Sequence, residues 1–377
     1  MDNLFKRQLQ IKPTIFEYDS CAEFATEFKF DKDDLVITNK FIYEPFFGKL
    51  GLNCGVLYQE EYGKGEPSDE MAEAIYKDIQ KKGTFKRIIA IGGGTVLDIA
   101  KLYALKDVSP ILDLFDGKMP PVKDKQLVLV PTTCGTGSEA TMISILELKS
   151  RQTKMGLAAP SLFADYAVMI PELLKGLPFE FFATSSIDAL IHAAESAVAP
   201  RSTPFTELFS YKAIEIIIRG YQEIAKNGKE ARMPLLKDFL IASCYAGIAF
   251  SNSGVGAVHA MSYPLGGKYH VPHGEANYAL FINIFKHYLS ISKEGKIAKL
   301  NKLIADLLGC STDQVYVELG KLLTTILPLK PLREYGVTNE DIVEFTANVM
   351  EKQGRLTANN FVPLDEKRVK QIYEELL

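Results

Sequence analysis

Short apolar runs alternate with amphipathic helical patterns through the first half of the chain. Four such runs lie at residues 34–39, 87–94, 126–133 and 166–171. Continuous apolar segments of this length are typical of strands that are buried on both faces of a parallel sheet. Between them lie helical patterns such as residues 68–83, where Ser68 can cap the helix and Met71, Ile75 and Ile79 recur four residues apart. This alternation predicts a doubly wound α/β unit.

The pattern changes after about Pro178. Segments 185–198, 209–228 and 235–250 are helical by period and rich in helix formers. We expect no strand beyond this point. Because 377 residues suffice for two separate cores, the sequence predicts an α/β domain over residues 1–178 and an all-α domain over residues 179–377.

The bulk properties are those of an ordinary globular protein. The net charge is -4, so nothing in the composition indicates a nucleic-acid partner. Five cysteines without a CxxC pair argue against a disulfide framework and a thiolate zinc site. The first ten residues lack the apolar core of a signal peptide, and no run approaches ~18 apolar residues. We therefore expect a cytoplasmic protein with no membrane span.

Two glycine-rich turns follow predicted strands. Gly92, Gly93 and Gly94 stand where a strand leads into a helix, and there the free N–H groups and the helix dipole favour a phosphate. The pattern is not GxGxxG, and a tight turn without a ligand is the alternative. The second turn contains Cys134, which we interpret as a small packing residue. Its polar side chains are those of Thr132, Thr133, Thr136 and Ser138. Two such turns at strand ends favour a phosphate-bearing ligand.

Histidines are few and concentrated. Asp188 and His192 lie four apart on one predicted helix, with Ser185 or Ser186 as its cap. His259 and His273 would be ~21 Å apart on a straight helix. Four helix breakers between them predict that the chain turns back; they are Pro264, Gly266, Gly267 and Pro272.

One carboxylate and three imidazoles would suit Fe²⁺ or Zn²⁺. Taken alone, Asp188 and His192 are better explained as a helix-stabilising aspartate beside a packed histidine. His287 has no partner in this pattern, and we expect it to be a core or surface residue.

Four motifs together resemble the iron-dependent (group III) alcohol dehydrogenase family over nearly the whole chain. They are GGGTVLDIAK, PTTCGTGSEAT, DALIHAAE and the stretch from VHAMSYPLGG to HVPHGEAN. The resemblance implies an N-terminal Rossmann-like domain with a parallel sheet, an all-α C-terminal domain, and a cleft that holds metal and a nicotinamide cofactor. It also implies a homodimer or larger homo-oligomer.

The resemblance assigns roles to particular residues. The metal would be bound by Asp188, His192, His259 and His273. The cofactor would be bound by Gly93, Gly94, Thr95, Asp98, Thr132, Thr133, Thr136, Ser138 and Lys154. Two positions depart from the family pattern: Asn39 stands where many members have a ribose-binding aspartate, and Tyr263 stands where many have a histidine. Because an amide does not repel a 2′-phosphate, we expect NAD to be preferred over NADP only moderately.

The implied activity is hydride transfer between a nicotinamide cofactor and a primary alcohol or aldehyde. Within the family the resemblance points to a carboxylate-bearing pair, 4-hydroxybutyrate and succinate semialdehyde. His270 is a candidate partner for the carboxylate, and Lys268, Tyr269 and Tyr263 lie in the same stretch. The alternatives are another alcohol or diol dehydrogenase of the family, a dehydroquinate-synthase-like lyase, and a nucleotide-binding regulatory protein.

Overall fold

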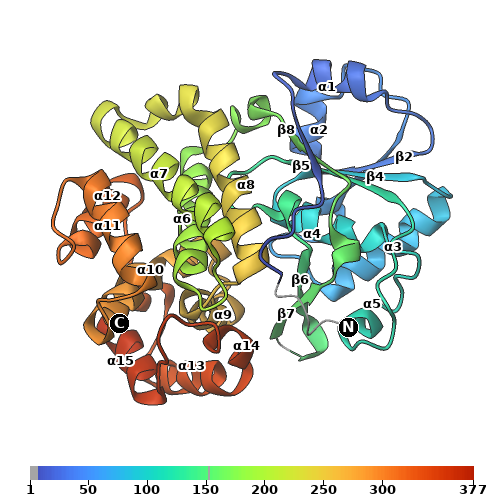
Figure 1. Cartoon of the computed structure of the whole chain (residues 1–377). Coiled ribbons are helices and arrows are strands. Elements are labelled where there is room, and N and C mark those ends of the chain that lie inside the picture. The colour runs from blue at the N-terminus through green and yellow to red at the C-terminus, as the bar shows by residue number, and fades with distance from the viewer. Residues whose placement is uncertain (1–6, 152) are drawn as a thin grey trace. The chain divides into compact units, whose positions relative to one another are not determined.

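The computed structural model describes residues 7–151 and 153–377, which divide into two compact units (Figure 1). Residues 11–177 form an α/β unit, and residues 178–377 form a helical unit. Residues 7–10 group with the helical unit, whereas the sequence analysis had placed them in the α/β domain. The reason is a pair of hydrogen bonds, because the backbone of Gln10 donates to Asn252 Oδ1 and accepts from Asn252 Nδ2.

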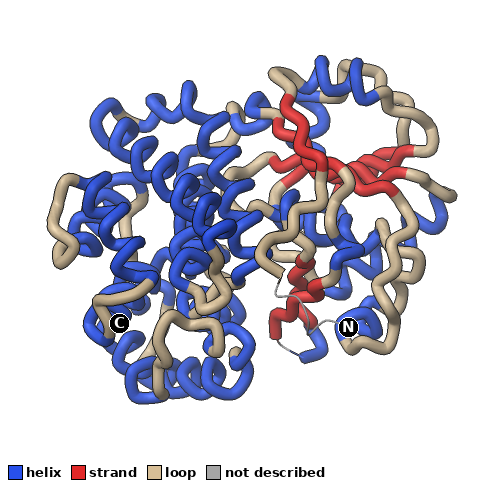
Figure 2. Tube along the Cα trace, in the orientation of Figure 1, coloured by secondary structure: helices blue, strands red, loops and turns tan. Residues whose placement is uncertain are grey.

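A six-stranded parallel sheet forms the centre of the α/β unit (Figure 2). In spatial order its strands are β1 (Thr14–Glu17), β8 (Tyr166–Met169), β5 (Gln126–Pro131), β4 (Arg87–Gly92), β2 (Asp34–Thr38) and β3 (Gly55–Tyr58). Every described residue of β2 is buried, and only the first residue of β4 and of β5 is partly exposed. The four apolar runs are thus confirmed as β2, β4, β5 and β8, while β1 and β3 are edge strands that the sequence analysis missed.

The helices of this unit connect and cover the strands. They are α1 (Cys21–Phe28), α2 (Lys40–Phe46), α3 (Asp69–Lys82), α4 (Gly94–Tyr103) and α5 (Ile111–Phe115). Ser68 caps α3 as expected, since its side chain accepts from the backbone N–H of Met71. An antiparallel hairpin of β6 (Ile143–Leu148) and β7 (Thr153–Ala158) was not expected. Ile75 of α3, Leu97 of α4 and Ile88 of β4 share one buried apolar core.

The second unit is helical throughout its described residues, as the sequence predicts. Its longer helices are α6 (Phe179–Val198), α7 (Pro204–Asn227), α8 (Leu236–Ser253), α9 (Ala257–Tyr269) and α10 (His273–Ile291). The remainder are α11 (Lys296–Leu308), α12 (Val315–Ile326), α13 (Asn339–Lys352), α14 (Gly354–Thr357) and α15 (Glu366–Leu376). The α/β domain followed by an all-α domain is therefore confirmed.

One helical stretch bears on the expectation that no segment of the protein spans a membrane. Lys229–Ser253 is long and apolar enough to cross a membrane by length and composition alone. More than half of its most apolar window is buried inside the protein, and α8, which makes up most of it, packs against α6 and α7. This is the environment of a core helix, whose apolar residues are covered by neighbouring helices.

Candidate functional site

Helix α6 places Asp188 and His192 one turn apart on the same buried face. The helix begins at Phe179 after Pro178, so the expected cap at Ser185 or Ser186 is wrong. Ser186 lies inside the helix, where its hydroxyl donates to the carbonyl of Phe182. The earlier start gives Asp188 a rigid position in the third turn of the helix.

Helices α9 and α10 bring the other two histidines to the same place. His259 lies in the first turn of α9, and His273 is the first residue of α10. The chain reverses at His270, which adopts a left-handed conformation with φ of 53°, and at Pro272. Of the four expected helix breakers, only Pro272 lies at this turn, because the other three are residues of α9. The helix continues through Pro264, although proline has no backbone N–H to donate to the preceding turn.

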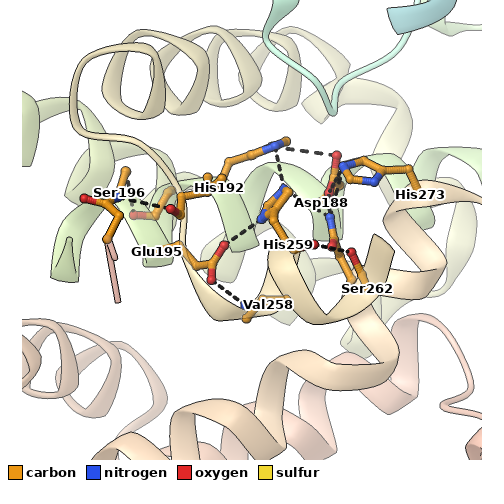
Figure 3. Close-up of polar contacts among 12 residues, drawn as sticks. Asp188, His192, Glu195, Ser196, Val258, His259, Ser262 and His273 are labelled. Carbon is orange, nitrogen blue, oxygen red and sulfur yellow. Dashed lines mark hydrogen bonds and ion pairs between the residues drawn. The ribbon is translucent and has the colours of Figure 1, made fainter. Parts of the chain in front are cut away.

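The four side chains converge on one point in the helical unit (Figure 3). Each offers one potential ligand atom, and these atoms all lie within 4.8 Å of one another. Nε2 of His259 is 3.0 Å from Nε2 of His192, and Nε2 of His273 is 3.9 Å from a carboxylate oxygen of Asp188. Asp188, His192 and His259 are buried, while His273 is partly exposed. Among the four residues, His273 is thus the one whose side chain solvent can reach.

A further carboxylate fixes the orientation of His259. Glu195 is buried, and one of its oxygens lies 2.6 Å from Nδ1 of His259. The other oxygen accepts from the backbone N–H of Val258, in the first turn of α9 (Figure 3). A carboxylate can only accept here, so Nδ1 carries the hydrogen and Nε2 presents its lone pair to the cluster. Glu195 therefore holds the imidazole in the tautomer that binds a metal ion.

Asn277 also faces the cluster. Its Nδ2 lies 2.8 Å from Asp188 Oδ1 and within 3.2 Å of Nε2 of both His259 and His273. Its Oδ1 is buried and has no hydrogen-bond partner among the described residues. The sequence analysis named neither Glu195 nor Asn277. The signal was present, because Glu195 is three residues after His192 and Asn277 is four after His273, which puts each on its histidine's helix face.

The electrostatics of the cluster favour an ionised Asp188. Burial by itself raises the pKa of its carboxyl, but electrostatic interaction with the three histidines and the hydrogen bond from Asn277 outweigh burial and lower it. The three nitrogens and one carboxylate are a donor set that divalent iron or zinc accepts. Together with the fixed tautomer of His259, these residues fit a metal ion.

The other candidates in the 259–277 stretch have separate surroundings. Tyr263 is partly exposed, and its ring centroid lies 6.2 Å from that of His273. His270 is exposed at the end of α9, and no described residue makes a hydrogen bond or ring contact with it. Lys268 forms ion pairs with Asp341 and Glu344, and Tyr269 donates to Asp341. Of these four side chains, Tyr263 is the one that has a ring contact with a residue of the cluster.

His287 plays no part in the cluster. Its Nε2 lies 2.9 Å from a carboxylate oxygen of Glu375, and its Nδ1 lies 3.2 Å from a guanidinium nitrogen of Arg368. The ring is buried on α10. This agrees with the expectation of a structural residue.

The two glycine-rich turns of the α/β unit touch each other. Gly93 is the N-cap of α4 and has no side chain with which to bind the free N–H groups of the first turn. A Cβ at Gly94 would lie 2.7 Å from Cγ2 of Thr136, and one at Gly93 would lie 3.5 Å from Cγ2 of Thr133. A side chain would therefore fill the space beside these N–H groups. The bare backbone at a helix N-terminus fits the diphosphate of a dinucleotide.

Several cofactor candidates have protein partners. Asp98 accepts from the hydroxyl of Ser138 at 2.5 Å and from the backbone of Ile145 at 2.9 Å. Lys101, which is fully buried, donates to Ser138 and to the carbonyl of Ile143. Burial lowers the pKa of Lys101, against the opposing effect of Asp98. Asp98 and Lys101 therefore hold the second turn in position.

The remaining candidates surround the first turn and the neighbouring strand ends. The hydroxyl of Thr95 donates to the carbonyl of Gly65. Thr132 is buried beside the end of β4, where its N–H donates to the carbonyl of Gly92. Lys154 on β7 is paired with Glu66. Cys134 is fully buried, as expected of a packing residue.

Family models match both halves of the chain. Residues 12–171 match the iron-containing alcohol dehydrogenase model, and residues 182–377 match the C-terminal model of the Fe-containing alcohol dehydrogenase family. The chain is 50% identical to 4-hydroxybutyrate dehydrogenase of Clostridium kluyveri over 368 residues, which cover 98% of this chain and 99% of that protein.

Solved structures share the fold. An alcohol dehydrogenase from Oenococcus oeni matches with a TM-score of 0.85 and 21% identity, covering 99% of this chain and 100% of that one. A sulfoacetaldehyde reductase from Bifidobacterium kashiwanohense, solved in complex with NAD+, matches with a TM-score of 0.84 and 21% identity, covering 99% of each chain. The chain therefore belongs to the iron-containing alcohol dehydrogenase family, whose members are metal-dependent oxidoreductases acting on alcohols.

Proposed function

We propose that this alcohol dehydrogenase interconverts 4-hydroxybutyrate and succinate semialdehyde, with NAD as its hydride carrier. The observation that carries the proposal is the convergence of Asp188, His192, His259 and His273 within 4.8 Å in a chain 50% identical to a 4-hydroxybutyrate dehydrogenase. The family relationship favours this reaction class over the lyase and the regulatory protein considered above.

The four converging side chains would hold one divalent metal ion, for which Fe²⁺ is our first choice and Zn²⁺ the second. When bound, the metal supplies a Lewis acid for the substrate oxygen and the nicotinamide supplies or accepts the hydride. Glu195 orients His259 for this role. The partly exposed side of the cluster, next to His273 and Tyr263, would admit the substrate.

The cofactor would bind through the α/β unit. The free N–H groups at Gly93 and Gly94 would receive the diphosphate, with Thr95, Thr132, Thr133 and Thr136 beside it. Asp98 and Ser138 would act by shaping the second turn. Asn39 and Lys154 would contact other parts of the dinucleotide. We expect NAD to be preferred over NADP.

We infer that residues 1–178 serve as the dinucleotide-binding domain and residues 179–377 as the metal and substrate domain. The enzyme would work in the cytoplasm as a homodimer or larger homo-oligomer. Neither nucleic acid nor a membrane would be a partner.

The carboxylate of the substrate needs a polar group beyond the metal. Tyr263, with its ring near His273, is a candidate donor, and His270 remains the candidate cation. We expect His270→Ala to raise the KM for succinate semialdehyde about tenfold, the effect of losing one hydrogen bond to a charged group, while the KM for butanal stays within about twofold. An equal rise for both aldehydes would assign His270 to the fold or the metal site.

The activity itself is tested by following NADH oxidation with succinate semialdehyde, butanal and a diol-derived aldehyde as substrates. The proposal predicts that succinate semialdehyde has the highest kcat/KM and that a chelator abolishes turnover. A higher kcat/KM for butanal would instead make the chain a general alcohol dehydrogenase of the family.

A further inference from the structure

A carboxylate from a neighbouring strand end holds the side chain of Asn39. Asn39 follows β2 directly, and Glu60 lies in the short helical turn after β3. Oε2 of Glu60 accepts from Nδ2 of Asn39 at 2.9 Å, and Oε1 accepts from the backbone N–H of Lys40 at 2.6 Å. Glu60 thus binds both the side chain of Asn39 and the first residue of α2.

These contacts decide which way the amide of Asn39 points. Its Nδ2 also lies 3.2 Å from Oε1 of Gln59, so the amide nitrogen faces two oxygens. An amide oxygen in that place would meet acceptors only, so the nitrogen must occupy it. The Oδ1 of Asn39 receives no hydrogen bond from the described residues and does not cap α2. It is left as an acceptor for a ligand.

The strand register puts this acceptor in line with the glycine turn. Thr38 pairs with Ile91 of β4 on one side and with Tyr58 of β3 on the other. Because the strands are parallel, Asn39 lies at the same edge of the sheet as the Gly93 turn, and Glu60 lies one strand further out. Neighbouring strands are about 4.8 Å apart. A dinucleotide with its diphosphate at Gly93 would therefore have its adenosine ribose within reach of Asn39 and Glu60.

We propose that Glu60 is the specificity-determining residue that rejects the 2′-phosphate of NADP, while Asn39 Oδ1 accepts a hydrogen bond from the ribose 2′-hydroxyl of NAD. This inference rests on the proposed dehydrogenase function. In many dinucleotide enzymes one carboxylate at the end of a strand does both tasks. In this chain the tasks are divided between an amide directly after β2 and a carboxylate after β3.

The charge of Glu60 makes the rejection stronger than Asn39 alone would suggest. A phosphate placed where Asn39 binds the ribose would stand close to a carboxylate whose two oxygens are fixed by Asn39 and Lys40. Like charges a few ångströms apart repel near a protein surface, and a tenfold loss of affinity requires about 1.4 kcal/mol. The preference for NAD should therefore be clearer than an asparagine by itself implies.

The test measures Kd values for NADH and NADPH by the change in nicotinamide fluorescence, without turnover. The variant is Glu60→Gln, which removes the charge, keeps the shape and loses one of the two hydrogen bonds that Glu60 accepts. The matched control is Glu61→Gln, because Glu61 is the next residue of the same turn and is exposed. We expect Glu60→Gln to tighten NADPH binding about tenfold relative to NADH, and Glu61→Gln to leave the ratio within twofold.

A second variant places a carboxylate at position 39, directly after β2, in place of the one removed at position 60. In Asn39→Asp/Glu60→Gln the carboxylate stands at the strand end itself, so the preference for NADH should recover to the wild-type value or beyond. The double variant also shows whether Glu60→Gln alone disturbs the fold. It restores a carboxylate–amide pair between positions 39 and 60, so a local disturbance in the single variant should be reversed.

The outcomes separate this inference from the proposed function. If the wild-type protein binds NADH but Glu60→Gln and Glu61→Gln have the same NADPH/NADH ratio, the role of Glu60 is wrong and the dehydrogenase proposal stands. If the double variant fails to recover the preference, the division of tasks between Asn39 and Glu60 is wrong. If the wild-type protein binds neither dinucleotide, both proposals fail.

Discussion

The two candidate binding regions are built from different parts of the chain. In the helical unit, four ionisable or imidazole side chains from α6, α9 and α10 point at one another. In the α/β unit, the cofactor turns offer mainly backbone N–H groups beside glycines that pack against threonine side chains. There the charged side chains of Asp98, Lys101 and Lys154 are engaged with protein partners.

This difference predicts how each region responds to mutation. The metal cluster depends on the chemical identity of each side chain, because the ligands are side-chain atoms. The cofactor turns depend on shape, because added atoms block the approach to the backbone. Substitutions should therefore affect metal binding and cofactor binding separately.

The largest effect is expected at the cluster. His259→Ala should remove bound metal and lower kcat by at least about a thousandfold, since a Lewis acid supplies several kcal/mol of transition-state stabilisation. Metal analysis and NADH turnover check this. The control is His287→Ala, which alters a buried histidine on α10 outside the cluster and should keep its metal. Full metal occupancy in His259→Ala would contradict the assignment of this ligand.

The next effect is expected at Lys101. Lys101→Met removes a buried charge that binds Asp98 and Ser138, and should lower the free energy of unfolding of the α/β unit by about 3 kcal/mol. NADH binding should weaken, while metal content should stay at the wild-type level. Denaturant unfolding and metal analysis test both statements. Loss of metal in this variant would mean that the two regions depend on each other.

Glu195 acts through His259 and should have a smaller effect. Glu195→Gln should weaken metal affinity about 10- to 100-fold, because the amide holds the imidazole less firmly than the carboxylate does. Replacing the native metal with Co²⁺ allows the affinity and the d–d spectrum to be measured without turnover. An unchanged spectrum and affinity would limit Glu195 to capping α9. NADH affinity should not change.

The smallest effect is expected at Gly94. Gly94→Ala places a Cβ 2.7 Å from Cγ2 of Thr136, which should raise the Kd for NADH about tenfold through crowding of roughly 1–2 kcal/mol. The control is Gly176→Ala, where no neighbouring atom lies within 4 Å of the added Cβ. Equal NADH affinity in the two variants would show that the turn can widen without cost.

The buried parts of the fold could be predicted from the sequence and the exposed parts could not. Strands β2, β4, β5 and β8 appear as apolar runs because they are almost wholly buried. Strand β1 is exposed at all four residues, so no apolar run marks it. Pro264 was misread because the surrounding helix α9 is held by tertiary packing, which overrides the local preference of proline and glycine.

The candidate site could also be predicted only in part. Side chains with distinctive chemistry, such as His192 and His259, could be named from the motifs. The contacts of Asn39 and Glu60 could not, because they depend on which strands are neighbours in the sheet. The order of strands in a sheet depends on the whole fold, so it cannot be predicted from a short stretch of sequence.

The central claim is that Asp188, His192, His259 and His273 hold the one metal ion that the reaction needs. The most direct test is to remove all metal from the wild-type protein and then add Fe²⁺ or Zn²⁺ stepwise. Bound metal and NADH-dependent reduction of succinate semialdehyde are measured at each step. The account predicts that turnover starts near zero and rises in proportion to bound metal until one ion per chain is reached. Full turnover in the metal-free protein would contradict it.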